Sequence, residues 1–163
     1  MRNPQVLNRK IYSLAELRQE IVRWRLFSHT ISFTNGCFDI LHPGHLATLS
    51  AAAEEADFLI VGLNSDASTR RLKGVGRPVL DQDSRSKMLA ALLMVDSVII
   101  FDEDTPLELI REILPDVLVK GGDYRIEEIV GAAETLAAGG RVVINPLVPG
   151  FSSSALLEKI QRL

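Results

Sequence analysis

The sequence predicts a single α/β domain built on an open, mostly parallel, doubly wound sheet of five strands, in the order 3-2-1-4-5, with helices on both faces. Two observations predict this class. Five short apolar runs rich in β-branched residues recur along the chain, and each is nearly continuous rather than alternating, which is typical of strands covered on both faces. Helical segments with their own start signals separate these runs, so strand and helix alternate.

The predicted elements follow in chain order. A helix over about 14–26 begins with a capping box formed by Ser13 and Glu16. A second helix begins at Pro43 and runs to about residue 56, after the first strand. The predicted strands are 30–34, 58–63, 97–101, 116–120 and 141–145.

The later helices carry clearer boundary signals. Asp81 is expected to cap a helix that runs to about residue 95. Thr105 and Pro106 open the next helix, with proline at its first position. Gly139 and Gly140 end the helix before the fifth strand, and a last helix covers about 153–162. Between the second strand and Asp81, residues 65–80 are predicted to be a loop.

Length and composition narrow the function classes. The chain has 163 residues, which is one domain by length; residues 1–28 are expected to form an N-terminal extension and helix, and residues 29–163 the catalytic core. A net charge of −3 favours neither a nucleic-acid nor a membrane surface. One cysteine, Cys37, excludes an internal disulfide, and three histidines make a zinc cluster improbable. No signal peptide or membrane-spanning run is found, so a cytoplasmic protein is expected.

A strand-to-helix turn, "TNGCFDILHPGHL" at 34–46, contains two of the three histidines. Here free backbone N–H groups and the positive end of a helix dipole meet the imidazoles of His42 and His45, next to Gly44. The turn therefore predicts a phosphate-binding site. The alternative is a plain turn in which the histidines are polar caps.

Two further segments are expected to share that cleft. In "VLVKGGDY", Gly121 and Gly122 would let the backbone approach a base or ribose, with Lys120 and Asp123 as polar anchors. Three serines open the last helix at 152–154 and suit a second phosphate. The alternatives are a solvated turn and an ordinary N-cap.

The predicted loop at 65–80 carries Arg70, Arg71, Lys73 and Arg77, and we expect it to close over bound nucleotide as a lid. The chain lacks the G-x-x-x-x-G-K-[ST] pattern of P-loop enzymes. "GVGRPV" lacks the third glycine of a dinucleotide fingerprint. Cys37 has no evident base partner and is expected to pack as a small apolar residue.

These residues resemble the His-x-Gly-His nucleotidyltransferase superfamily. More specifically, "FTNGCFDILHPGHL", "VGLNSDASTRRLKGVGRPV", "DEDTPLELI", "PDVLVKGGDY" and "GFSSSALLEKI" resemble, in order, the adenylyltransferase domain of bifunctional ADP-heptose synthase. The resemblance covers about residues 11–163 and implies a Rossmann-like fold. It also implies an enzyme that joins D-glycero-D-manno-heptose 1-phosphate to the AMP part of ATP, releasing pyrophosphate, for lipopolysaccharide or related glycans. Full-length relatives often carry a sugar kinase domain, so the resemblance implies a stand-alone form served by a separate kinase.

The resemblance also implies roles for individual residues. His42 and His45 would contact the ATP phosphates, Lys73 would reach them from the lid, and Arg85 would lie over the same charge. Mg²⁺ would arrive mainly on the ATP phosphates, and no protein metal ligand is expected. The remaining residues of the nucleotide and acceptor pocket would be Thr34, Asn35, Gly36, Phe38, Asp39, Gly44, Asn64, Lys120, Gly121, Gly122, Asp123, Tyr124, Ser152, Ser153 and Ser154.

The chemistry fits such a site, because an anomeric phosphate oxygen is already anionic and needs no general base. Two other functions stay open on the sequence. One is a cytidylyltransferase acting on glycerol 3-phosphate or a related alcohol phosphate, and the other is a non-catalytic nucleotide-binding module. The apolar faces of the first and last helices would serve either a homodimer interface or the core.

Overall fold

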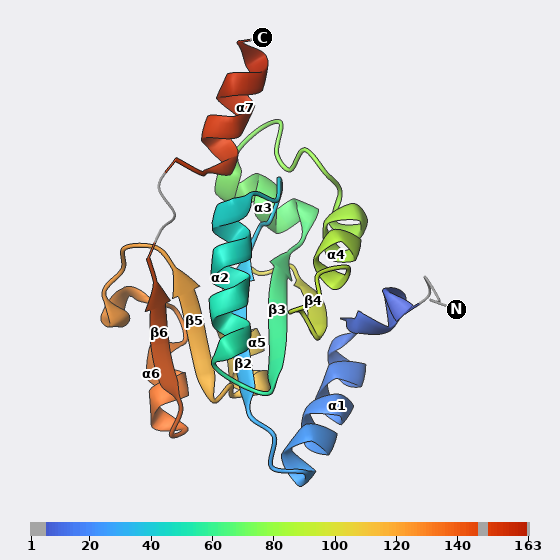
Figure 1. Ribbon diagram of the computed structural model, residues 1–163, viewed down its shortest axis with the longest axis vertical. Coiled ribbons are helices and arrows are strands. Elements are labelled where there is room, and N and C mark those ends of the chain that lie inside the picture. The colour runs from blue at the N-terminus through green and yellow to red at the C-terminus, as the bar shows by residue number, and fades with distance from the viewer. Residues whose placement is uncertain (1–5, 147–149, 163) are drawn as a thin grey trace.

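The computed structural model describes residues 6–146 and 150–162. Its strands form one parallel sheet in the order β1-β4-β3-β2-β5-β6 (Figure 1). The strands are β1 (Ile11–Tyr12), β2 (Ile31–Gly36), β3 (Phe58–Asn64), β4 (Ser97–Phe101), β5 (Val117–Gly121) and β6 (Arg141–Asn145).

The five predicted strands are β2 to β6, and they lie side by side in the predicted order. The predicted count of five is wrong, because β1 adds a sixth strand at the edge beside β4. β1 is two residues long, too short to show any hydrophobic period. The doubly wound, Rossmann-like parallel architecture is confirmed.

Seven α-helices and two short 3₁₀ turns connect the strands in the described part of the chain. The helices are α1 (Leu14–Leu26), α2 (Pro43–Glu54), α3 (Asp66–Lys73), α4 (Gln82–Ala90), α5 (Leu107–Ile113), α6 (Ala132–Ala137) and α7 (Ser153–Gln161), and the 3₁₀ turns are η2 (Asn8–Lys10) and η3 (Ile126–Glu128).

The predicted helix starts at Pro43 and near residue 153 are confirmed, because α2 begins at Pro43 and α7 at Ser153. Two predicted caps are confirmed as well. Ser13 and Glu16 form the predicted capping box at α1, and Asp81 accepts a 2.7 Å hydrogen bond from the Ser84 N–H at the start of α4. The start at Thr105 is wrong, since α5 begins at Leu107 and no side chain caps it.

The predicted loop at 65–80 is also wrong in its first half, where α3 forms. Ser65 caps α3 by accepting a hydrogen bond from the Ser68 N–H at 3.0 Å. Only Ala67 and Leu72 of α3 are apolar, so the segment has too few apolar residues to indicate a helix with a buried face. α4 ends at Ala90 rather than near residue 95.

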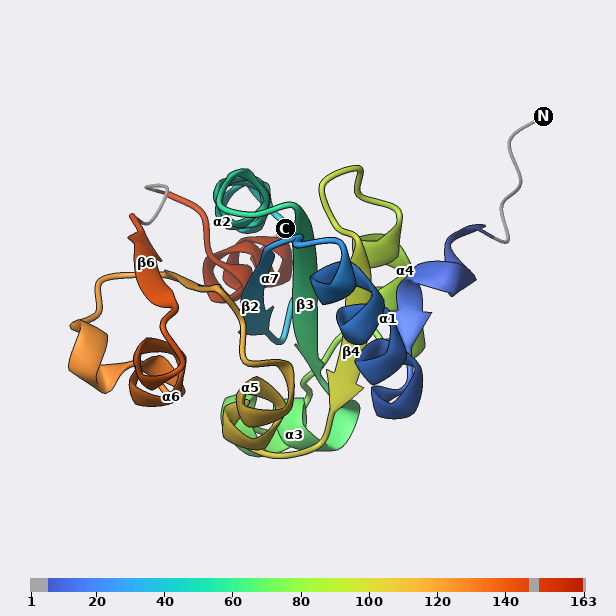
Figure 2. The same cartoon turned by 90° about the horizontal axis from the view of Figure 1, so that it is seen from below.

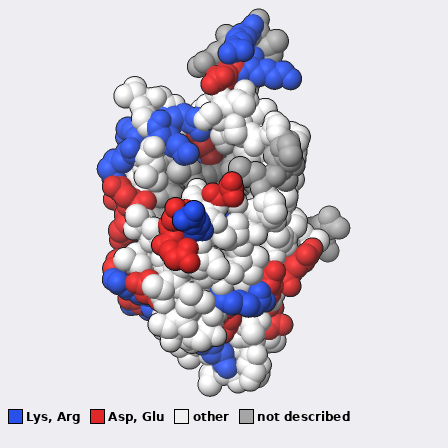
Figure 3. All heavy atoms as spheres, turned by 90° about the vertical axis from the view of Figure 1, so that its left-hand side faces the viewer, with Lys and Arg blue, Asp and Glu red and all other residues white. Residues whose placement is uncertain are grey.

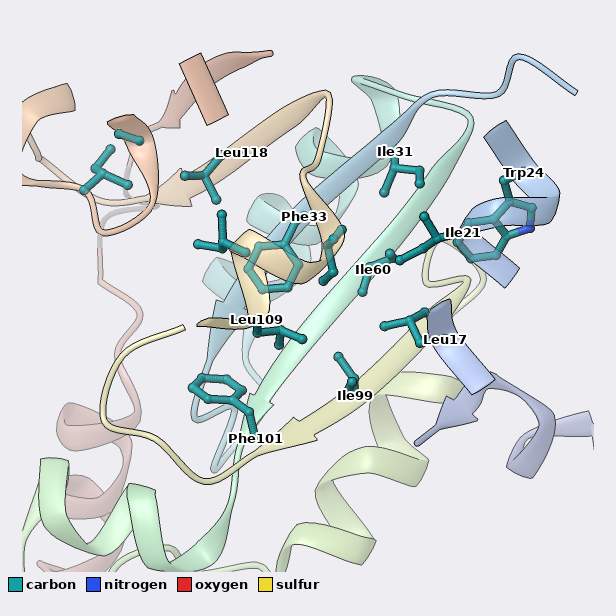
Figure 4. Packing of buried hydrophobic residues seen from close by; sticks show 14 residues of the cluster. Leu17, Ile21, Trp24, Ile31, Phe33, Ile60, Ile99, Phe101, Leu109 and Leu118 are labelled. Atoms are coloured by element: carbon teal, nitrogen blue, oxygen red, sulfur yellow. The ribbon is translucent and has the colours of Figure 1, made fainter. Parts of the chain in front are cut away.

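Two hydrophobic clusters cover the two faces of the sheet. One face packs against α1, α5 and α6, and the other packs against α2 and α4 (Figure 2). Figure 4 shows the first cluster, in which Ile60 lies near Ile21 of α1 and Phe33 lies near Leu109 of α5. The ring of Trp24 stacks on that of Phe58 at 4.3 Å. Both faces of the central strands are therefore dry, as their continuous apolar runs predict.

α7 stands apart from these layers, beyond the carboxyl ends of the strands (Figure 1). On the face that Figure 3 shows, lysines and arginines are interspersed with acidic side chains. No helix in the described ranges is long and apolar enough to cross a membrane.

Candidate active site

A cavity of about 630 Å³ opens where the carboxyl ends of β2, β3 and β5 meet the N-termini of α2 and α7. This edge of a parallel α/β sheet is where such folds bind ligands. The predicted site residues that line it are Thr34, Asn35, Gly36, Phe38, Asp39, His42, Gly44, His45, Asn64, Lys73, Lys120, Gly121, Tyr124, Ser152, Ser153 and Ser154. The cavity wall does not include Arg85, Gly122 or Asp123.

The two histidines form a stacked pair at the start of α2. Their ring centroids lie 3.8 Å apart, and the planes differ by 20°. His42 is the N-cap, and its Nδ1 accepts a hydrogen bond from the His45 N–H at 3.3 Å. Because Nδ1 accepts, a neutral His42 carries its proton on Nε2, which makes that atom a donor.

Gly44 leaves room for this stack. A Cβ at Gly44 would meet the His42 ring at 3.0 Å, closer than nine in ten real contacts of a Cβ, so the ring would have to shift. Pro43 occupies the first position of the helix, where its missing N–H costs nothing. The His-Pro-Gly-His order therefore follows from local packing as well as from function.

Both imidazoles have lowered pKa values. Burial lowers the pKa of His42. The pKa of His45 falls to about 4, first because of burial, then because of the charge of His42; the Ile40 carbonyl opposes the shift and Lys73 adds to it. The Nδ1 atom of His45 is buried and has no partner with hydrogen-bond geometry in the described part of the chain. With no ligand bound, His45 is therefore neutral at pH 7.

Two lysines face the same space. Lys120 donates a 3.4 Å hydrogen bond to Asn35 Oδ1, and its Nζ lies 6.0 Å from the centre of the Tyr124 ring. Burial lowers the pKa of Lys120, a nearby Cys37 opposes that shift, and Lys73 adds to it. The charge of Lys73 thus lowers the pKa of both His45 and Lys120. The negative charge of a bound polyanion would offset this repulsion between cationic groups.

Asp39 holds the segment after α3 in place. Its carboxylate accepts from Arg77 Nε at 2.5 Å, from the Val79 N–H at 2.6 Å and from the Leu80 N–H at 3.2 Å. The Asp39 residue is 2% exposed. Although it lines the cavity as predicted, its carboxylate is already engaged by protein groups.

Arg85, expected to lie over the phosphate charge, is buried and is not part of the cavity wall. Its guanidinium is 1% exposed and forms an ion pair with Asp66 at 2.7 Å. It also donates to the carbonyls of Cys37 at 2.5 Å and Asn64 at 2.9 Å, while Nε donates to Leu80 at 3.0 Å. These protein groups engage the guanidinium on several sides. Arg85 ties together the ends of β2 and β3 and the start of α4.

The glycines after β5 are explained by packing. A Cβ on Gly121 would lie 2.5 Å from Thr48 Oγ1 of α2, and one on Gly122 would lie 2.3 Å from the Tyr124 ring. Gly122 also has φ of +142°, which favours glycine. Gly122 and Asp123 therefore shape the turn that places Tyr124, and do not themselves face the cavity.

The serines of α7 connect that helix to the histidine turn. Ser152 Oγ accepts from the Ala155 N–H at 3.0 Å as the N-cap, and Ser153 Oγ donates to the Ile40 carbonyl at 3.4 Å. All three serines line the cavity. The hydroxyls and the helix N-terminus therefore face the imidazoles across the same space.

Several lining residues escaped the sequence analysis. Thr105 was expected to cap a helix and lies in the cavity wall. Cys37 also lines the cavity and is partly exposed, so the expectation of a plain packing residue is wrong. The sequence signal for Thr105 was its place just after a strand, at the same edge as the histidine turn. The other lining residues outside the predictions are Thr48, Leu72, Arg77, Asp104, Pro106, Leu118, Glu128, Ile129, Val130 and Phe151.

Comparison with known proteins agrees with this geometry. The bifunctional protein HldE of Rhodopseudomonas palustris strain BisB5 is 56% identical over 149 residues, which is 91% of this chain and 30% of that protein. HldE of Nitrobacter hamburgensis is 52% identical over 147 residues, again 90% of this chain and 30% of the relative. The chain thus spans about 30% of the length of these curated relatives.

A solved structure is also similar. The lipopolysaccharide core biosynthesis protein from Thermoplasma volcanium GSS1 superposes with a TM-score of 0.61 at 26% sequence identity, covering 74% of this chain and 98% of that one. Residues 33–159 match the cytidylyltransferase-like family, a range that contains both stacked histidines and all the residues of the cavity wall. The chain therefore belongs to the cytidylyltransferase-like family.

Proposed function

We propose that this chain is an adenylyltransferase that joins D-glycero-D-manno-heptose 1-phosphate and ATP to give ADP-heptose and pyrophosphate. The observation that carries the proposal is the pair of stacked, neutral imidazoles at the N-terminus of α2, which share one cavity with Lys73, Lys120 and the serines of α7. Such an array of donors and cations fits a triphosphate.

In this proposal the β- and γ-phosphates of ATP lie against the N-terminus of α2. His42 donates from Nε2, and the helix dipole adds to the attraction. Lys73 reaches the same phosphates from the end of α3. The base lies toward Tyr124 and Phe151, two of the aromatic side chains of the cavity wall.

The reaction needs no base, because a sugar phosphate oxygen is anionic at neutral pH. That oxygen attacks the α-phosphorus in line with the bond to the leaving pyrophosphate. The new bond joins sugar phosphate to AMP, and the broken bond releases pyrophosphate with its charge. The protein contributes position and stabilisation of the growing charge.

Mg²⁺ is proposed to arrive on the ATP phosphates and to neutralise part of their charge. Within residues 6–146 and 150–162, no group of three potential metal-ligating side chains is found. The carboxylate of Asp39 is held by Arg77 and two backbone N–H groups. The donor side chains of the cavity suit phosphate oxygens better than a metal ion.

The names of the relatives support a sugar phosphate of lipopolysaccharide synthesis as the acceptor substrate. Both HldE proteins are described as bifunctional, and the similar solved structure is a lipopolysaccharide core biosynthesis protein. We therefore propose that a sugar kinase supplies the sugar 1-phosphate. We also propose that the protein resides in the cytoplasm and forms a homodimer.

A pyrophosphate-release assay tests the function. Purified protein is supplied with each of the four nucleoside triphosphates against heptose 1-phosphate, other sugar 1-phosphates and glycerol 3-phosphate. The expected result is release with ATP and heptose 1-phosphate only. Release with CTP and glycerol 3-phosphate would support the cytidylyltransferase alternative. Nucleotide binding with no release from any acceptor would mean a binding module.

A further inference from the structure

Asn64, at the end of β3, has an amide whose orientation is fixed by its neighbours. Its Nδ2 donates to Ser68 Oγ at 3.0 Å, and Ser68 Oγ donates in turn to the Glu103 carbonyl at 2.8 Å. A hydroxyl has one hydrogen to donate. Because Ser68 gives its hydrogen to Glu103, it must accept from Asn64, and the amide cannot turn its oxygen toward Ser68.

The other side of this amide faces the cavity. Asn64 is 3% exposed and lines the cavity wall. Among the hydrogen bonds of residues 6–146 and 150–162, none ends on its Oδ1. Asn64 Oδ1 is also not among the fully buried side-chain atoms that lack a partner, so it is accessible from the cavity. A side chain that is almost wholly buried therefore presents one unpartnered acceptor to the cavity, where leaving it unpaired is costly.

The position of Asn64 in the sheet assigns it to one side of the reaction. Ile60 belongs to the cluster on the α5 face and Leu63 to the cluster on the α2 face, so alternation along β3 places Asn64 on the α5 face. His42 and His45 lie on the other side, at the N-terminus of α2. Figure 2 shows α2 and α5 on opposite faces of the sheet.

In-line displacement puts the attacking and leaving oxygens on opposite sides of the reacting phosphorus. If the pyrophosphate leaves toward α2, the acceptor molecule comes from the α5 side, where Asn64 lies. An amide oxygen repels phosphate oxygens, so its partner must carry a hydrogen-bond donor. The ring and side-chain hydroxyls of a sugar 1-phosphate are such donors.

We propose that Asn64 Oδ1 binds a hydroxyl of the acceptor sugar and that Ser68 is the residue that positions it. The assignment rests on the proposed function for the identity of the sugar. It gives the site a means of choosing the acceptor that is separate from its phosphate-binding groups. A site built to accept from a hydroxyl discriminates strongly against acceptors that lack it.

The test measures KM for each substrate separately in four proteins. Asn64→Ala should raise KM for heptose 1-phosphate about tenfold, the loss of one hydrogen bond, while KM for ATP stays within about twofold. Ser68→Ala keeps the Asn64 amide oxygen but leaves the amide free to turn. This variant should therefore raise KM for heptose 1-phosphate by about threefold.

Thr69→Val is the matched control. Thr69 is buried in the same helix, and its hydroxyl donates to the Asn64 backbone carbonyl at 3.4 Å. Its KM values should match wild type.

A series of single-deoxy analogues of the sugar phosphate identifies the hydroxyl. On one analogue, wild type and Asn64→Ala should have equal KM values, because each has lost one partner of the same bond. An equal rise in KM for both substrates, or a wild-type advantage kept on every analogue, would overturn the assignment. Should Asn64→Ala not fold, as judged by thermal unfolding, Ser68→Ala gives the answer.

Failure of the proposed function is separable from failure of this assignment. If wild type uses another acceptor from the panel, the heptose proposal is wrong. The same four proteins are then compared on that acceptor. If Asn64→Ala raises KM for that acceptor and not for ATP, the role of Asn64 in acceptor binding is upheld. If KM for that acceptor is unchanged, Asn64 has no such role.

Discussion

Two basic segments border the cavity, and they are built in opposite ways. The histidine turn is buried, stacked and capped, with the ring of His42 packed over Gly44. The segment from Lys73 to Gly76 is exposed, with Val75 101% exposed and nothing within 4 Å of where a Cβ would lie on Gly74 or Gly76. The first segment holds its hydrogen-bond donors in fixed positions before substrate arrives. The second can bring its charge only by ordering around bound substrate.

The largest effect should come from the rigid segment. His42→Ala or His45→Ala should lower kcat for pyrophosphate release by about 10²-fold or more, as expected for the loss of one preorganised donor. Lys73→Ala is the comparison from the exposed segment and should cost less, since a flexible side chain offers weaker preorganisation. A smaller loss for a histidine variant whose thermal unfolding is unchanged would remove that histidine from the chemistry.

A second test separates structure from chemistry beneath the histidine turn. Arg85→Ala removes a buried guanidinium from Asp66 and from three carbonyls, so the free energy of unfolding should fall by about 3 kcal/mol or more. Arg71→Ala, which breaks an exposed ion pair with Asp104, should cost less than about 1 kcal/mol. Denaturant unfolding measures both. Unchanged stability with a raised KM for ATP would instead make Arg85 a phosphate contact.

The neutral state of His45 predicts how stability depends on pH. Its pKa is about 4 in the folded protein against 6.5 in the unfolded chain. The unfolded chain therefore binds more protons between these values, and stability falls as pH drops from about 6.5 toward 4. At pH 5 the loss should be about 1 kcal/mol after allowing for partial exposure.

Urea unfolding at pH 7.5 and pH 5 measures this loss. His45→Gln serves as the control because it cannot titrate, and the other ionisable groups affect both proteins alike. The pH-dependent loss should be larger in wild type than in His45→Gln. Equal losses would contradict a depressed pKa at His45.

The exposed segment should show the smallest effect. Trypsin cleavage between Thr69 and Pro78 should slow several-fold when ATP and sugar phosphate saturate the site, because the segment closes over them. Asp39→Asn should speed cleavage in the free protein, since Asp39 accepts from Arg77, Val79 and Leu80. Cleavage that substrates leave unchanged would rule out a lid.

The same contrast explains what could be predicted from the sequence. The central strands were predictable because burial on both faces leaves a continuous apolar run. The histidine turn was predictable because capping, proline and glycine signals act over a few residues. β1 and α3 were missed because β1 is two residues long and α3 has too few apolar residues to be recognised as a helix.

The roles of Arg85 and Asn64 depend on contacts across the chain. Arg85 pairs with Asp66 and with a carbonyl of Cys37, 48 residues away. Asn64 is oriented through Ser68 by the carbonyl of Glu103. Neither arrangement leaves a local pattern, so the contacts by which Arg85 holds these loops together could not be predicted from the sequence.

The most direct test of phosphate binding at the histidine turn is nuclear magnetic resonance of the imidazole rings during titration with Mg²⁺-ATP. The chain has three histidines, and His29 is an internal control, because it precedes β2 at the opposite end of the sheet and lies 3.7 Å from Asp57. We expect the ring signals of His42 and His45 to shift and the pKa of His45 to rise, while those of His29 stay unchanged. Saturating nucleotide that leaves His42 and His45 unmoved, or moves all three alike, would contradict the account.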